Sequence, residues 1–207
     1  TNGAYRQLHD LSSTELMKRS IFGVWYTQEV ADLFQYLQEQ EKKGDPLVLT
    51  GFDIQVMGKF FTKSTYDWIK QVDPSKAELF KQAEESMVKL RTQKTEADFI
   101  QEQTKINEQY STLERFVEEH RKELASSSPQ HEQAVEILSQ SLKLRKETLM
   151  RYELPSWKAD HSVPIYDIEE HPMVLRDRMM AENLEFLAEE MYPTEKIIVW
   201  GHNYHVR

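Results

Sequence analysis

The stretch that decides the fold reads Leu47-Val48-Leu49-Thr50-Gly51-Phe52-Asp53. A short apolar run that ends in glycine and a polar residue is typical of a buried strand that delivers a side chain at its carboxyl end. The same form returns near the end of the chain, where the apolar run 196–200 is followed by Gly201 and His202. We therefore predict that residues 47–50 and 196–200 are strands of one parallel sheet. Asp53 and His202 would then share the rim where open α/β sheets bind ligands.

Helices are expected on both sides of the first strand candidate. Residues 12–22 and 27–43 carry apolar side chains at helical spacing, with Thr27 as an N-cap and Gly44 as a stop. Further along, Ser64, Asp73 and Thr95 each stand where an N-cap would open a helix.

Two apolar stripes at helical spacing follow, over residues 106–124 and 135–152. The polar turn sequence 126–129 separates them, which predicts an antiparallel helical hairpin. The sequence therefore predicts an α/β fold that is mainly helical by content, in which parallel-sheet strands border a large helical insertion. Its parts would be 1–63 with one strand, 64–152 as the helical insertion, and 153–207 with one helix and one strand.

Composition limits the function. The 207 residues are 39% hydrophobic and carry a formal net charge of -9, so a folded protein that repels nucleic acid and anionic lipid is expected. There is no cysteine, no apolar run of membrane-spanning length and no signal peptide, which fits a cytoplasmic location. The chain starts at Thr1 without Met, and both ends look cut from a longer protein; the oligomeric state is left open.

The predicted helix over residues 172–191 contains an anomaly. Arg176 falls near the middle of its apolar half, with Asn183 beside it. Because a buried guanidinium is costly unless it is paired, this position predicts either a carboxylate partner, such as Asp53 or Asp177, or an anionic ligand group.

His202 and His205 follow the second strand candidate, and Gly201 favours a turn in which the two imidazoles converge. Convergent histidines serve as general acid and base or as metal ligands, and a lone histidine at a strand end can also be structural. No Gly-x-Ser-x-Gly sequence is present, so a serine nucleophile of the α/β-hydrolase kind is not expected in this segment.

Four motifs in order along the chain together resemble the erythromycin esterase family. They are Trp25-x-Thr27-x-Glu29, Gly51-Phe52-Asp53-x-Gln55, Arg176-Asp177-x-x-Met180-Ala181-x-Asn183 and Gly201-His202-Asn203-x-His205. They span nearly the whole chain, and the ordered set is far more specific than any one of them.

The resemblance implies an α/β protein with an inserted helical subdomain that hydrolyses a small-molecule carboxylic ester or lactone, through water activated by histidine and glutamate. His202 and His205 match active-site histidines, and Arg176 matches an arginine of the cleft. Asp53, Trp25, Glu29, Asp177 and Asn183 match positions that bind substrate or support these residues. No cofactor is implied. Macrolide lactones are the named substrates, yet antibiotic resistance does not follow from the resemblance alone.

The family's other essential histidine and glutamates belong to a Gly-Glu-x-x-His segment that is absent from this sequence. It is expected before Thr1, so this stretch by itself should be inactive.

Two alternatives stay open. One is a metal-dependent hydrolase in which His202 and His205 bind a divalent cation. The other is a non-enzymatic module in which the hairpin over 95–152 binds a partner helix or a second copy of itself.

Overall fold

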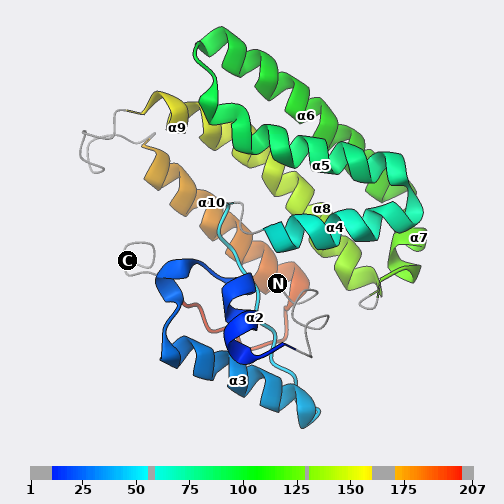
Figure 1. Cartoon of the computed structure of the whole chain (residues 1–207), viewed down its shortest axis with the longest axis vertical. Coiled ribbons are helices and arrows are strands. Elements are labelled where there is room, and N and C mark those ends of the chain that lie inside the picture. The colour runs from blue at the N-terminus through cyan, green and yellow to red at the C-terminus, as the bar shows by residue number, and fades with distance from the viewer. Residues whose placement is uncertain (1–10, 56–58, 129–130, 160–170, 202–207) are drawn as a thin grey trace. The chain divides into compact units, whose positions relative to one another are not determined.

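The computed structural model describes residues 11–55, 59–128, 131–159 and 171–201, and its regular structure over these ranges is helical (Figure 1). The α-helices are α2 (Ser13–Ser20), α3 (Gln28–Lys42), α4 (Lys59–Val72), α5 (Pro74–Lys89), α6 (Glu96–Glu119), α7 (Arg121–Ser126), α8 (His131–Thr148), α9 (Leu154–Lys158) and α10 (Pro172–Phe186). Short 3₁₀ turns lie at Gly23–Trp25 and Leu90–Thr92, and π-helical turns at Leu149–Glu153 and Leu187–Met191. Within these ranges, no helix has the length and apolar character needed to cross a membrane.

The expected parallel sheet is not present in the described residues, so the α/β assignment was wrong for them. Residues 47–50 and 196–200 are irregular, and much of their apolar surface is exposed, up to 93% for Ile198. A strand exists only through hydrogen bonds to a neighbouring strand, and an apolar run without that partner cannot form one. The described part of the chain is instead all helical.

The chain divides into two compact units. One consists of Thr1–Gly51, Gln55–Lys81 and His120–Val135, and the other of Phe52–Ile54, Gln82–Glu119 and Glu136–Arg207. Both are discontinuous in sequence, and the second takes only three residues from the stretch around position 53. The three parts expected from the sequence, 1–63, 64–152 and 153–207, were drawn from its composition. This division stays a prediction.

In the first unit, α2 and α3 form a small core of their own. Ser12 caps α2 with a reciprocal capping box to Glu15, and Thr27 caps α3 through the backbone N–H of Val30. Gly44 follows the C-terminal end of α3 and has a φ of +81°, a backbone conformation that favours glycine. The buried side chains of this core are Leu16, Met17, Val30, Ala31, Phe34 and Leu37. The expected helices, cap and stop are confirmed here.

Two of the three later caps are also confirmed. Asp73 accepts hydrogen bonds from the backbone N–H groups of Ser75 and Lys76, and Thr95 accepts one from Asp98. The expectation for Ser64 was wrong, because this residue lies inside α4 and its hydroxyl donates to the carbonyl of Phe61. Serine bonds backward in this way when the helix has already begun.

The expected antiparallel hairpin is visible in the second unit through contacts of α6 with the end of α8 and with the π turn that follows it. Gln103 donates to the carbonyl of Leu149, and further along α6 the carboxylate of Glu114 pairs with Lys146. The order of these contacts runs in opposite directions along the two helices, as an antiparallel pair requires. We find a break at His120, whose backbone leaves the helical region and separates α6 from the short α7.

The helix that begins as α8 continues further than expected. The apolar stripe predicts an end at residue 152, but a π-helical turn, Leu149–Glu153, leads directly into α9. Pro155 lacks a backbone N–H, and in a regular α-helix its ring would crowd the carbonyl of Arg151 one turn earlier. The wider π turn just before Pro155 relieves that crowding and lets the helix run on.

Candidate active site

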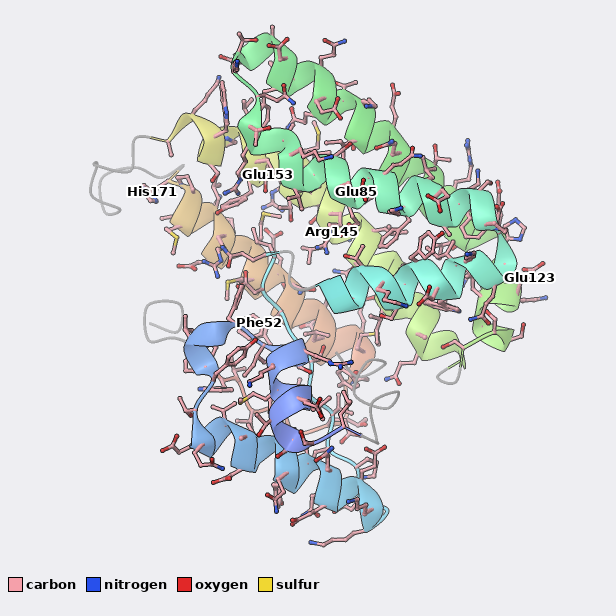
Figure 2. All side chains as sticks on the ribbon, in the orientation of Figure 1. Phe52, Glu85, Glu123, Arg145, Glu153 and His171 are labelled. Atoms are coloured by element: carbon pink, nitrogen blue, oxygen red, sulfur yellow. The ribbon has the colours of Figure 1, made fainter. Side chains whose placement is uncertain are left out.

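The candidate site is built on α10, whose first residues explain where the helix starts. The Nδ1 atom of His171 accepts a hydrogen bond from the backbone N–H of Met173 at 3.1 Å, and Pro172 occupies a first-turn position where its missing N–H does no harm. The expectation that His171 and Pro172 open this helix is confirmed. Figure 2 labels His171 at this end of α10.

Arg176, in the second turn of α10, forms a two-pronged ion pair with Asp53, 123 residues away in the sequence. Its Nε lies 3.0 Å from Oδ1 and its Nη2 lies 2.5 Å from Oδ2 of Asp53. The arginine side chain is 12% exposed and the aspartate 25%. Of the two carboxylates expected from the sequence as partners, Asp53 and Asp177, Asp53 makes the pair.

The electrostatics of the pair follow from its partial burial. Desolvation works to lower the pKa of Arg176, but the hydrogen bonds and charge of Asp53, with smaller contributions from Tyr152 and Asp177, raise it above its usual value. Arg176 therefore stays protonated. A cation that is fixed by two parallel hydrogen bonds has its orientation set in advance, which is what binding of a carbonyl oxygen or an oxyanion requires.

Residues 52–54 are held on the second unit by three different interactions. The carbonyl of Phe52 accepts a hydrogen bond from Asn183 Nδ2 at 3.0 Å, and Asp53 binds Arg176. Ile54 is 1% exposed and packs in a cluster with Tyr152 and Met179. Phe52 is held by its backbone, Asp53 by its charge and Ile54 by apolar packing. Together these three contacts fix the position of the Asp53 carboxylate.

Asn183 is itself oriented by a neighbour that the sequence analysis did not single out. The Nε2 atom of Gln140, on α8, lies 3.5 Å from Asn183 Oδ1. Asn183 is buried, with its amide nitrogen committed to Phe52. Gln140 lies on a helix rich in polar residues, so only its contact with Asn183 distinguishes it.

Tyr152, Arg91 and Glu153 were also missed. Arg91 binds Glu153 through Nε and Nη2 at 2.7 and 3.2 Å, and its guanidinium carbon lies 5.4 Å from the centre of the Tyr152 ring. Tyr152 had been assigned only to an apolar stripe. The one local signal was Pro155, because a proline shortly after an apolar helix marks a change in helix geometry.

Trp25 and Glu29, two further positions from the family motifs, belong to the first unit. Trp25 ends the 3₁₀ turn, and Glu29 lies in the first turn of α3. Hydrogen bonds to its own backbone N–H and to Thr27 lower the pKa of Glu29. The structure brings together Asp53, Arg176 and Asn183, with Asp177 beside Arg176 in sequence.

His202 and His205 lie outside the described residues, which end at residue 201 in this region. Their role therefore stays a prediction. Among the side chains that the structure describes, no group of three or more histidines and carboxylates is placed to hold a metal ion.

A shallow hollow of about 230 Å³ lies between α8 and the second half of α10. Met179 and Asn183 contribute to its lining, which connects it to the residues that fix Asp53. Its other lining residues are Gln140, Lys143, Leu144, Glu147, Glu182, Glu185, Phe186, Glu189 and Glu190. The abundance of carboxylates disfavours an anionic ligand there.

Comparison with known sequences identifies the class of protein. The sequence model described as Erythromycin esterase matches residues 2–207, so the chain belongs to the erythromycin esterase family. The chain is also 42% identical over 208 residues to a protein of Bacillus subtilis (strain 168) named "Putative hydrolase YbfO". That match covers 100% of this chain but 47% of the relative, so the chain spans about half the relative's length. No solved structure matches the chain significantly.

Proposed function

We propose that this chain is part of a hydrolase that cleaves a carboxylic ester or lactone with an activated water molecule. Membership of the erythromycin esterase family and the hydrolase name of its Bacillus subtilis relative support this proposal. The observation that carries it is the ion pair between Arg176 and Asp53, a partly buried cation held in one orientation. The activity is proposed for the longer protein, because the chain spans 47% of that relative.

In the proposed reaction, Arg176 holds the substrate carbonyl. Asp53 engages Nε and Nη2, which form one edge of the guanidinium. The other edge, with Nη1, would face the carbonyl oxygen and stabilise the negative charge that develops on it. Asp53 would not touch the substrate; it would hold the arginine in place.

His202 is the proposed acid–base residue, with His205 sharing the site or supporting it. A histidine takes a proton from water as the water oxygen attacks the ester carbon. The bond between that carbon and the alcohol oxygen then breaks, and the alcohol leaves with a proton. A second base from a Gly-Glu-x-x-His segment of the longer protein completes the proposed site.

The test is ester hydrolysis by the full-length protein and its Arg176→Ala and Asp53→Asn variants. A short aryl acetate and a macrolide lactone serve as substrates, and acid release is followed at constant pH. Since one oxyanion donor contributes about 100-fold or more, Arg176→Ala should lower kcat/KM by at least that factor. Arg151→Ala is the matched control, because Arg151 also binds a carboxylate with two prongs, that of Glu182, but is exposed.

Wild-type turnover by Arg176→Ala would contradict the proposal. Activity that disappears on dialysis against a chelator and returns with a divalent cation would replace it with the metal-dependent mechanism.

The interaction-module alternative has no support in the described residues, where Ile100 and Met150 are the large exposed apolar side chains within 95–152. Two separated side chains do not make a docking face.

A further inference from the structure

Residues 197–200 form an exposed apolar run in the second unit. The exposed fractions are 41% for Ile197, 93% for Ile198, 44% for Val199 and 47% for Trp200. The chain is still packed shortly before this run, because Leu187 and Tyr192 are buried and the backbone N–H of Tyr192 donates to the carbonyl of Leu187. The exposure therefore begins where the chain leaves the π turn that follows α10.

Four large apolar side chains in succession differ from the other exposed apolar residues of this unit. Single exposed apolar side chains are common on protein surfaces, but a contiguous group of them marks a place of contact. Val88, on α5, is 72% exposed, and it stands alone between buried Met87 and the charged, exposed Lys89. Residues 197–200 include no charged side chain, so they present a longer apolar surface to water.

The remainder of the longer protein is the occupant that the observations favour for this surface. The match to the Bacillus subtilis relative covers 100% of this chain and 47% of the relative, so more than half of the relative's length lies outside the match. A segment of the same polypeptide has a high effective concentration, which a separate partner lacks. A lipid surface is disfavoured, because the chain carries a net charge of -9 and repels anionic headgroups.

The position of the run along the chain agrees with this occupant. Residue 200 is followed after one glycine by His202, the proposed acid–base residue. The second base of the proposed reaction belongs to the part of the longer protein outside this chain. Contact between that part and residues 197–200 would bring the two contributions to the proposed site together.

We propose that residues 197–200 are the surface on which the part of the longer protein outside this chain packs. Packing there removes the four apolar side chains from water, which is favourable in proportion to the area covered. The inference rests on the proposed function, because both take this chain to be about half of one polypeptide. It goes beyond that function by naming the surface along which the two parts meet.

The first test measures access to residue 198 in the full-length protein. Ile198→Cys and Val88→Cys each add a thiol, and this chain has no cysteine of its own; the unmodified protein reports any thiol elsewhere. A water-soluble maleimide should react at least about tenfold more slowly at 198 than at 88, because a covered thiol is inaccessible. In this structure Ile198 is the more exposed of the two. Equal rates in the folded protein would overturn the proposal.

The second test identifies what covers the run. The photoreactive residue p-benzoylphenylalanine is placed at position 198 of the full-length protein, and at position 88 as the control. After irradiation, mass spectrometry identifies the joined peptides. Position 198 should join to a residue outside this chain in the same copy of the protein, and position 88 should not. A cross-link from 198 into this chain or into a second copy, or no cross-link, would overturn the proposal.

Neither test depends on ester hydrolysis, so the two proposals fail separately. A protein that cleaves no ester but shows a slow thiol at 198 and the expected cross-link would refute the proposed function and leave the contact in place. A protein that cleaves esters while its thiol at 198 reacts as fast as the one at 88 would refute the contact and leave the function in place.

Discussion

Asn183 donates a hydrogen bond to the backbone carbonyl of Phe52 over 3.0 Å, and 131 residues of chain separate the two. The bond lies just after residues 47–50, the stretch that was expected to pair with a neighbouring strand, and its donor is a side chain of α10. The bond satisfies the carbonyl next to Asp53 and so holds the aspartate in register with Arg176.

Removing the Asn183 amide should loosen residues 52–54. We expect Asn183→Ala to lower the free energy of unfolding by about 1–3 kcal/mol, because a partly buried carbonyl loses its partner. Hydrogen exchange at the amides of Asp53 and Ile54 should accelerate, as measured by mass spectrometry. Gln35→Ala is the control, since its amide makes an exposed bond to Glu39; exchange rates at residues 52–54 that match in both variants would contradict this role.

Removal of a charge from one buried cluster of the second unit should lower the stability of the protein strongly. Glu84 accepts hydrogen bonds from Tyr110 at 2.8 Å and from Arg145 at 3.0 Å, and all three side chains are buried. Arg145 is labelled in Figure 2 among the helices of this unit. Arg145→Ala leaves a buried carboxylate without its cation and should cost about 3–5 kcal/mol in urea unfolding.

The exposed Arg151→Ala change provides the comparison for Arg145. The side chains of Arg151 and Glu182 are 38% and 45% exposed, so solvent screens their attraction and its loss should cost at most about 1 kcal/mol. A cost for Arg145→Ala as small as this would show that the cluster is not electrostatically coupled.

The helix cap formed by Asp73 should make the stability of the folded protein depend on pH. A hydrogen bond from the Ser75 hydroxyl, followed by bonds from the backbone of Lys76 and Ser75, lowers the pKa of Asp73. A carboxylate with a lowered pKa in the folded state contributes stability that is complete above its unfolded pKa and is lost as the pH falls through its folded pKa. The stability difference between wild type and Asp73→Ala should therefore begin to shrink as the pH falls below about 4 and should be smallest at pH values below the lowered pKa of the folded state.

Near neutral pH, Asp73→Ala should cost about 1 kcal/mol, and Asp73→Asn much less, because asparagine also caps helices. Thermal unfolding of the variants across this pH range is the measurement. A difference that stays constant down to strongly acidic pH would mean that the Asp73 charge plays no part in the cap.

His202 should be required for turnover. As an acid–base residue it should contribute about 100-fold or more, so His202→Ala in the full-length protein should lower ester hydrolysis by that factor without unfolding it. His161→Ala, in the segment before α10, should have a smaller effect. Equal hydrolysis by His202→Ala and wild type, with circular dichroism confirming the fold of both, would remove His202 from the mechanism.

Local signals in the sequence were sufficient to predict several helices of this protein. The caps at Thr27, Asp73 and Thr95 and the glycine stop at Gly44 are formed by hydrogen bonds and backbone preferences within a few residues. The sequence also predicted that Arg176 needs an anionic partner, because its neighbours on the helix are apolar and burial of an unpaired charge is costly.

Tertiary structure decided everything that depends on a distant partner. Asp177 adjoins Arg176 on the same helix, where adjacent side chains point about 100° apart, so the remote Asp53 was the one able to form the two-pronged pair. Residues 47–50 and 196–200 have strand-like composition, but a strand needs a hydrogen-bonded neighbour, and the described residues provide none. The places of Gln140 and Tyr152 beside the ion pair were likewise undetectable, because periodicity shows which face of a helix is buried and leaves open what packs against it.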